Sequence, residues 1–596
     1  MFSARDCVSV LRIVGRLSFL FTHEHFYTRY SAAKNIVDRL LNSVVFSNHN
    51  RLYHIEVPSI LNEALVNIHS QLVGTLQASA YWLLQLSGEE SEKQNDFVTL
   101  TTSLVNNCVE IIIAGDGGLY PRKVVKSAIL CLLSIANSVR PKLLISLLSI
   151  QTLFNRVFSS VKPTPTESSD CKTMNSLTLV LECEDELLLV ELVSKSLLLP
   201  WCNVNESQQE WHTRAQHHDT FIYKLTEPLQ KSYNEVHKSD HVLKSLLQRN
   251  LPLLTHIVNA HSDSPTRSKQ LLFHSISQSL DMMRLLMPNY LKEPEIGELF
   301  LVYFLAVFDV LRSLVQLQFI EQVVGVIFNV FSQQSVGNND SMACSKLLDK
   351  FFKMLTLLVQ QSASNLKTLI PGMLTLVLTQ LSPFIMQSMV PDVLSCFFEF
   401  LYQFLFNNFK YFFKSNSLLY SINNAQSQPE NVEHEAEFIQ IMSHYGESFC
   451  QPDLNLFKQN LLALENLNFR LKLYHKSTFK KNLLRQFLCL FMQTFVLKSH
   501  NTLQDEITNV VYNMASVDFD YFYKNFIPHF LETYEGIDNH QKESLASNFI
   551  KNSARDLPSF SLNLQQFAND LRYYKICNTS WSQAQGLSSM GIVNPF

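Results

Sequence analysis

The chain has 596 residues, of which 46% are hydrophobic and 17% are charged, against roughly 25% charged residues in average globular proteins, so wholesale disorder is excluded. Its 14 glycines are about 2% of the residues, whereas average usage is roughly 7%. Because sheets, tight turns and phosphate loops rely on glycine, we expect a nearly all-helical protein. The formal net charge of -4 provides no basic field for nucleic acid, so we expect no nucleic-acid partner.

Cysteine usage and the N-terminal sequence bear on the compartment. The 11 cysteines are scattered singly, without a CxxC pair, which is typical of free thiols in the reducing cytosol or nucleus. Asp6, Arg12 and Arg16 interrupt the apolar residues of the first 21 positions, so we expect no secretory signal there.

The only glycine cluster lies at residues 114–123, AGDGGLYPRK. A phosphate-binding loop requires GxxxxGK[ST] after a strand, so that backbone N–H groups surround the phosphate. Here the lysine spacing and the strand are both wrong, and the cluster therefore predicts a turn between two helices.

Apolar residues recur at helical spacing along much of the chain. One stripe lies between residues 143 and 154 and another between residues 301 and 315, each with i, i+3/i+4, i+7 spacing. Their members are Leu143, Leu144, Leu147, Leu148, Leu153 and Phe154, and Leu301, Phe304, Leu305, Phe308, Leu311 and Val315. Such helices need a partner, and hairpin signals between alternating strands are almost absent.

A leucine-rich segment near residue 185 carries an acidic run. Its members are Glu182, Glu184, Asp185, Glu186 and Glu191. We interpret the run as the solvated outer face of a helix. The alternative is a docking patch for a basic partner, where complementary charge would mainly speed and orient association.

Histidines, which are common metal ligands, occur in two groups: His212, His217 and His218, and the pair His23 and His25. Zinc sites combine such residues with cysteine or carboxylate partners at fixed spacing, and no HExxH motif or cysteine pair accompanies them. We interpret them as loop and surface histidines. No GxSxG elbow is present either, so we assign no catalytic, cofactor-binding or metal residues and expect no enzyme.

The uncharged run from Thr368 to Pro391 has the length of a membrane span, about 20 apolar residues. Pro371 and Pro383 interrupt it, and several polar residues lie inside it. We predict two short buried helices broken by proline, and no membrane insertion.

Ten aromatic residues crowd the segment 397–413, more than one core stripe of a helix can hold. They are Phe397, Phe398, Phe400, Tyr402, Phe404, Phe406, Phe409, Tyr411, Phe412 and Phe413. We predict that both faces of this helix are buried between neighbouring repeats. An exposed aromatic surface for a protein partner is the alternative.

Polar breaks separate the helical blocks at residues 159–172, 203–219, 261–269, 332–345 and 421–437. The blocks between them suit stacked helix hairpins, so the predicted fold is all-α, an α-solenoid of HEAT-like helical repeats, which run about 40 to 47 residues each. In a solenoid each unit contacts its neighbours and the array offers an extended binding surface. This architecture indicates binding rather than chemistry.

From Cys450 onward several segments are recognisable together. They are CQPDLNLFKQN (450–460), KLYHK (472–476), KSH (498–500), YNMASVDFD (512–520), RDLPSF (555–560) and NDLRYY (569–574). In this order they resemble the C-terminal region of the exportin-6 family, a branch of the importin-β superfamily of nuclear export receptors. None of them is a catalytic motif.

The resemblance implies a HEAT-repeat receptor that binds protein cargo with Ran-GTP in the nucleus and releases both in the cytoplasm. It implies profilin-actin as cargo, contacts with nuclear pore proteins, and shuttling between nucleus and cytoplasm. It implies no cofactor for the chain itself, since the GTP is bound to Ran. It assigns no individual residue to cargo or to Ran.

The sequence differs from the family in two ways, its length and its C-terminal tail, and both affect the predicted domain organisation. Family members are about twice this length, so the chain resembles their C-terminal half and is expected to be N-terminally incomplete, which leaves direct contact with Ran open. We divide it into HEAT-like repeats at 1–420, a flexible polar loop at 421–437, C-terminal HEAT-like repeats at 438–580 and a divergent tail at 581–596. A cytoplasmic HEAT-repeat scaffold without Ran dependence is the rival hypothesis.

Overall fold

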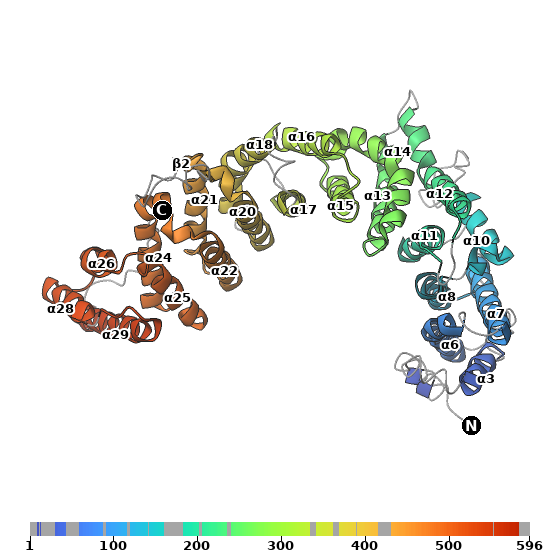
Figure 1. Cartoon of the computed structure of the whole chain (residues 1–596), viewed down its shortest axis with the longest axis horizontal. Helices are drawn as coiled ribbons and strands as arrows, with labels where there is room; N and C mark the ends of the chain where they lie inside the picture. Colours follow the sequence, from blue (N-terminus) through green and yellow to red (C-terminus); the bar gives the residue numbers. More distant parts are fainter. Residues whose placement is uncertain are drawn as a thin grey trace, which may run out of the picture. The chain divides into compact units, whose positions relative to one another are not determined.

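The computed structural model describes residues 9–10, 12–13, 30–42, 59–86, 91–115, 120–140, 142–159, 183–201, 206–234, 240–333, 341–360, 369–388, 390–414, 431–551 and 553–582. Nearly all of them lie in helices or short turns (Figure 1). The two strands within these ranges, β1 (Phe413–Lys414) and β2 (Asn431–Val432), pair antiparallel, with Phe413 opposite Val432. The all-α prediction is confirmed. The chain forms two compact units, Met1–Val326 and Ile327–Phe596, and the division falls inside helix α16 (Leu317–Gln333).

Unit 1 consists of two layers of helices. One layer stacks α6 (Ser59–Leu86), α8 (Arg122–Ser134), α11 (Cys183–Leu198), α13 (Asp240–Ala260) and α15 (Pro294–Val310), each against the next. The other layer stacks α7 (Ser91–Gly115), α10 (Leu148–Ser159), α12 (Gln208–Asn234) and α14 (Thr266–Tyr290). The smaller elements are α3 (Tyr30–Leu41), the π turn η1 (Ile135–Val139) and α9 (Leu143–Ser146).

Unit 2 has the same plan. Its first layer stacks α17 (Ser341–Gln360), α20 (Pro391–Phe412), α22 (Leu454–Leu471), α25 (Gln504–Ala515) and α29 (Leu557–Ser582). Its other helices are α18 (Ile370–Thr375), α19 (Ser382–Ser388), α21 (Glu435–Ser448), α23 (Ser477–Asn482), α24 (Leu484–Leu497), α26 (Phe519–Tyr521), α27 (Ile527–Thr533) and α28 (Asn539–Lys551). The short turns are η2 (Leu376–Leu381), η3 (Leu473–His475), η4 (Asn501–Leu503) and η5 (Phe522–Phe526).

The spacing of the hairpins is irregular. In the first layer of unit 1, successive helices begin at Ser59, Arg122, Cys183, Asp240 and Pro294, which are 63, 61, 57 and 54 residues apart. These repeats are longer than the 40 to 47 residues expected from HEAT arrays. Because insertions of different length separate the helices, the sequence shows no strict period even though the solenoid fold was predicted correctly.

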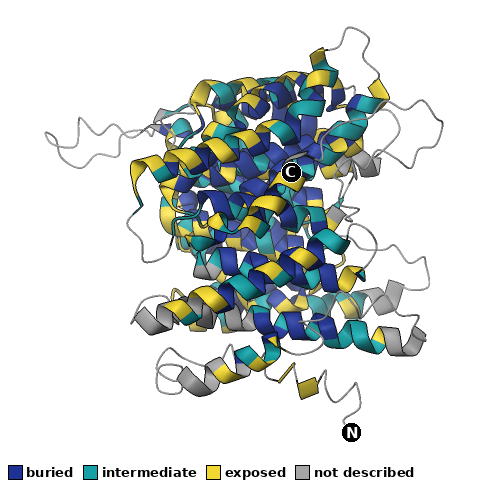
Figure 2. Ribbon diagram, turned by 90° about the vertical axis from the view of Figure 1, so that its right-hand side faces the viewer, coloured by how far each residue is buried: buried dark blue, intermediate teal, exposed yellow. Residues whose placement is uncertain are grey.

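The core of each unit lies between its two layers. Figure 2 colours the buried residues of the ribbon dark blue. The predicted stripe at 301–315 is confirmed within α15, where Leu301, Phe304 and Phe308 are almost fully buried. Leu311 and Val315 are buried too, but they lie in the turn after the helix ends at Val310. The prediction that the apolar residues at 143–154 share one helical face was wrong. Leu147 is extended with ψ 128°, which separates α9 from α10 and leaves Leu148 77% exposed.

Helical structure continues across the segment that was predicted to break at its prolines. From Ile370 to Ser388 the chain passes through α18, η2 and α19 without leaving the helix. The residue before Pro383 donates its N–H to Val377 O, five residues back instead of four. A proline has no N–H and its ring clashes with the carbonyl four residues earlier, so a wider turn accommodates it. The windows 370–387 and 98–115 are long and apolar enough to cross a membrane by length and composition, and about half of each is buried inside the fold.

A π turn precedes a proline in the sequence at two further places. Arg140 donates to Ile135 O directly before Pro141, and Ile527 donates to Phe522 O directly before Pro528. At Pro528 the helical segment continues into α27, whereas Arg140 is left-handed, with φ 42°, and ends the segment that η1 belongs to.

The predicted polar breaks have mixed outcomes. The one at 203–219 was wrong for most of its length, because α12 begins at Gln208. The one at 261–269 includes a turn up to Ser264, and α14 starts at Thr266. Residues 160–182, 334–340, 415–430 and 583–596 lie outside the described residues. Within the predicted loop at 421–437, Asn431–Val432 form β2 and α21 begins at Glu435, while the predicted tail at 581–596 begins inside α29, which ends at Ser582. The remainder of the loop and of the tail stays a prediction.

Candidate binding surfaces and buried polar sites

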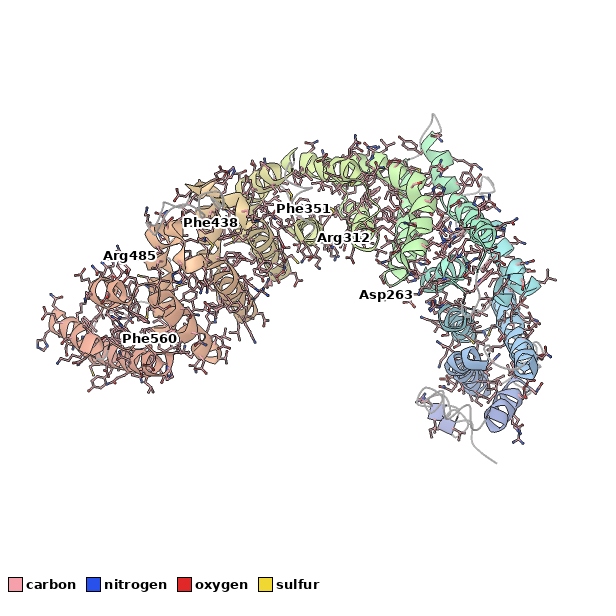
Figure 3. The ribbon with its side chains drawn as sticks, viewed as in Figure 1. Asp263, Arg312, Phe351, Phe438, Arg485 and Phe560 are labelled. Atoms are coloured by element: carbon pink, nitrogen blue, oxygen red, sulfur yellow. The ribbon has the colours of Figure 1, made fainter. Side chains whose placement is uncertain are left out.

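The aromatic segment of α20 is a packing element. None of its ten aromatic side chains is exposed, and Phe397, Phe398, Phe400, Phe404 and Phe412 are almost fully buried. Phe352 of α17 contacts this helix, with ring centroids 5.6 Å from Phe397 and 6.0 Å from Phe400. Figure 3 shows two further buried rings of unit 2, Phe351 and Phe438. The prediction that both faces are buried is confirmed, and the alternative of an exposed aromatic surface here was wrong.

The prediction that the acidic run of α11 forms a solvated face was wrong. Asp185 is 1% exposed and accepts a hydrogen bond from Arg122 of α8 at 3.1 Å. Glu186 pairs with Arg249 of α13 at 2.7 Å. The run thus links α11 to both of its neighbours in the first layer. Of its described members only Glu184, which pairs with Lys126, is well exposed, and Glu182 lies outside the described residues. Sequence periodicity does not reveal this, because the cations that pair with Glu184, Asp185 and Glu186 come from helices more than 50 residues away.

Glu191 continues this strip of charge. Its carboxylate lies 2.8 Å from both Lys195 Nζ and His256 Nε2. Burial alone would raise the pKa of Glu191, but the hydrogen bonds from His256 and Lys195 outweigh it and lower the pKa to about 2. The carboxylate is therefore ionised at neutral pH and keeps α11 and α13 in register.

The predicted histidine cluster is divided between surface and core. His212 and His217 are exposed, as predicted, although they lie on helix α12 and not in a loop. His218 was wrongly predicted, because it is fully buried. One helical position moves a side chain by about 100°, so three nearby histidines need not share a face. His23 and His25 lie outside the described residues.

His218 belongs to a hydrogen-bonded chain of polar side chains in the core of unit 1. Ser194 Oγ lies 2.9 Å from Nε2 of His218 and 2.9 Å from Nε2 of His261. On the far side, His218 Nδ1 lies 2.9 Å from Ser275 Oγ, which donates to Asp219 at 2.5 Å. His261 Nδ1 lies 2.9 Å from Ser264 Oγ.

The proton positions in this chain follow from its ends. Ser275 uses its only proton on Asp219, so His218 must carry its proton on Nδ1 and donate it to Ser275. Ser194 then donates to the bare Nε2 of His218 and accepts from Nε2–H of His261. Desolvation lowers the pKa of both imidazoles to about 3, so both are neutral at physiological pH.

These residues include the types found in serine hydrolases, but the arrangement is structural. Ser194, His218 and His261 are all fully buried, so no substrate reaches the hydroxyl. The Asp219 end of the chain borders a groove of about 420 Å³ between α12 and α14. The chain therefore satisfies buried polar groups where α11, α12 and α14 meet.

A second buried polar site holds the start of α12. The Arg214 guanidinium lies between two indoles, 4.3 Å from the ring centroid of Trp201 and 4.2 Å from that of Trp211. The guanidinium carbon of Arg267 also lies over the Trp211 ring, 4.6 Å from its centroid. Arg214 also pairs with Glu206 and donates to Leu199 O at 2.8 Å. The sequence analysis missed this site, although two of the chain's four tryptophans within eleven residues were a usable signal.

Among the described residues no group of three or more His, Cys, Asp or Glu side chains could hold a metal ion. The described cysteines are free, and burial raises the pKa of the half-buried thiols Cys396, Cys450 and Cys489. What remains are helix surfaces. Two layers of stacked helix hairpins with such surfaces define an α-solenoid, a class whose members bind other macromolecules along their helices.

Comparison with known proteins narrows this class. Residues 405–577 match the family described as "Exportin-6, C-terminal TPR repeats". The chain is 36% identical to exportin-6 of Danio rerio over 586 residues and 35% identical to exportin-6 of Homo sapiens over 591 residues. It is also 26% identical over 591 residues to exportin-6 of Dictyostelium discoideum. The chain is therefore a homologue of the exportin-6 proteins.

The similarity extends over nearly all of the chain. It covers 97% of the chain for the Danio and human proteins and 96% for the Dictyostelium protein. The chain spans about half the length of these relatives, 50% of the first two and 51% of the third.

Proposed function

We propose that this chain is part of a nuclear export receptor, which carries protein cargo from the nucleus to the cytoplasm in a Ran-GTP-dependent manner. The observation that carries the proposal is the 35–36% identity to exportin-6 proteins over 97% of the chain. We further propose profilin-actin as the cargo, contacts with nuclear pore proteins, and shuttling between the two compartments. A transport role needs no catalytic residues, cofactor or membrane insertion of its own, and we propose none.

The mechanism proposed for such a receptor is coupling between two partners through a deformable helix stack. If Ran-GTP and cargo favour the same curvature, each strengthens the binding of the other by the same factor. The ion pairs Arg122–Asp185 and Arg249–Glu186 cross two successive interfaces of the first layer, beside their buried apolar contacts. Small changes at each interface add along the array.

The test is capture of purified profilin-actin on the immobilised chain, with Ran in its GTP form, with Ran in its GDP form and without Ran. We expect more cargo to be retained with Ran-GTP than in either control. Equal capture in all three would contradict Ran dependence and favour the rival hypothesis, a HEAT-repeat scaffold in the cytoplasm. Absence of capture would contradict the assignment of profilin-actin to this part of the receptor.

A further inference from the structure

The charges of the chain are distributed very unevenly around α22 and α24. Residues 466–504 contain seven lysines and arginines and no aspartate or glutamate, in a chain whose formal net charge is -4. They are Arg470, Lys472, Lys476, Lys480, Lys481, Arg485 and Lys498. The net charge of the whole chain does not reveal this local excess of positive charge, because acidic residues elsewhere in the sequence balance it.

Four of these cations form an exposed rim at the end of α22. Arg470, Lys472, Lys480 and Lys481 are all exposed, and the described residues provide no ion pair for any of them. The turn η3 and helix α23 bring the rim together. The turn η3 contacts both α22 and α23, so the cations at the end of α22 and those on α23 are joined through this one turn.

The other cations of the segment are engaged. Lys476 lies over the stacked rings of Phe409 and Phe413, 5.5 Å and 5.2 Å from their centroids. Arg485, labelled in Figure 3, lies on α24 and contacts His529. Of the described acidic groups nearby, Glu465 accepts from Tyr474 and Asn513, and Glu435 accepts from Asn482. Neither carboxylate pairs with a rim cation, and the four rim cations outnumber the two carboxylates.

An apolar side chain lies directly beside this rim. Phe469 is 75% exposed, and of the phenylalanines whose burial is described it is the only exposed one. Leu462, 51% exposed, lies seven residues earlier on the same face of α22, with the exposed Lys458 one turn before it. Burial of the Phe469 ring against a partner would remove this apolar surface from water, which favours association.

We infer that Phe469, Leu462 and the cations Arg470, Lys472, Lys480 and Lys481 form a docking surface for an acidic protein segment that places an apolar side chain between carboxylates. An aromatic or apolar anchor with charged residues at its edge is the usual composition of an interface hot spot. The rim charges would steer an acidic partner and set its orientation, while Phe469 and Leu462 lose contact with water on binding. The inference does not depend on the proposed function.

The surface is tested on the full chain with a fluorescein-labelled peptide in which two leucines are flanked by glutamates, using fluorescence anisotropy. We expect Lys472→Glu with Lys480→Glu to weaken binding by about tenfold or more, and Phe469→Ser to weaken it several-fold. The matched controls are Lys292→Glu and Leu148→Ser, at a lysine and a leucine exposed in unit 1, and both should leave binding unchanged. Circular dichroism melting curves establish that each variant is folded.

Two further probes separate this surface from a general affinity for polyanions. A peptide with glutamine in place of glutamate should bind weakly, and so should one with serine in place of leucine. Wild-type protein that does not bind the acidic peptide would overturn the inference, and so would equal binding by the rim variant. Binding of a short DNA duplex that is as tight as peptide binding and indifferent to Phe469→Ser would also overturn it.

Discussion

The guanidinium of Arg214 lies 4.2 Å from the ring centroid of Trp211 and belongs to a side chain that is only 3% exposed. A cation in this position has lost most of its hydration, and the stacked indole together with Glu206 compensates for it. The planar guanidinium is suited to this site, because it stacks on a ring and donates in its own plane at the same time.

The first prediction concerns this stack. Arg214→Lys should lower the free energy of unfolding by about 2 to 4 kcal/mol, since an ammonium cannot lie between two rings and also reach Leu199 O. Urea unfolding followed by tryptophan fluorescence measures the change. Arg267→Lys is the control, because Arg267 is exposed and covers only one ring. Equal effects of the two substitutions would contradict the proposed role of the sandwich.

The second prediction concerns pH. Burial lowers the pKa of His218 and of His261 to about 3, well below the ordinary value near 6.5. Between these values the unfolded chain binds more protons than the folded one, so stability is complete above about pH 6.5 and falls as the pH decreases. From pH 7 to pH 5 we expect a loss of about 2 kcal/mol for each histidine.

The substitution His218→Gln should reduce stability at pH 7 and flatten this pH dependence. His217→Gln, at an exposed position one residue earlier, should leave the slope unchanged. Chemical denaturation of unit 1 at several pH values provides the comparison. A wild-type slope that persists in the His218→Gln variant would show that other groups cause the acid sensitivity.

The third prediction concerns close packing of α7 on α8. A Cβ atom added at Gly115 would lie 2.6 Å from Cγ2 of Val125, a contact that the helices must relieve by moving. Gly115→Ala should therefore destabilise unit 1 by about 1 to 3 kcal/mol. Shortening Val125 to alanine in the same chain should recover part of the loss.

Gly325 provides the opposite case within the same unit. An added Cβ there meets nothing within 4 Å, so Gly325→Ala in α16 should stabilise the helix by about 0.5 to 1 kcal/mol. Thermal melting of both variants measures the two changes in stability. Stabilisation by Gly115→Ala, or similar effects at the two positions, would contradict the packing described between α7 and α8.

The fourth prediction concerns the strip of charge on α11. Glu186→Gln and Arg249→Met should each destabilise unit 1, and the double variant should lose less than the sum of the two single changes. We expect a coupling of about 1 kcal/mol or more, because Glu186 and Arg249 are both largely buried and lie 2.7 Å apart. Additive losses would mean that the pair contributes nothing as a pair.

The sequence was sufficient for the class of fold and for the crowded helix α20, because both depend on composition and local spacing. Ten aromatics within seventeen residues require burial on both faces, and the structure buries them. The resemblance from Cys450 onward likewise agreed with the comparisons.

Sequence patterns failed where long-range partners decide the outcome. The acidic run was assigned to solvent because Arg122 and Arg249, which pair with it, lie on other helices. His218 was assigned to the surface because its partners Ser194 and Ser275 come from α11 and α14. Pro383 was treated as a breaker, although the π turn before it moves the clashing carbonyl.

The proposed export receptor function is tested most directly by one quantity. This is the dissociation constant of profilin-actin from the chain, measured at saturating Ran-GTP and without Ran. Coupling through the helix stack predicts tighter binding with Ran-GTP, by about 5- to 150-fold. The reciprocal experiment should give the same factor for Ran-GTP with and without cargo. Measurable cargo binding with a ratio of one in both directions would contradict the account and leave a Ran-independent scaffold.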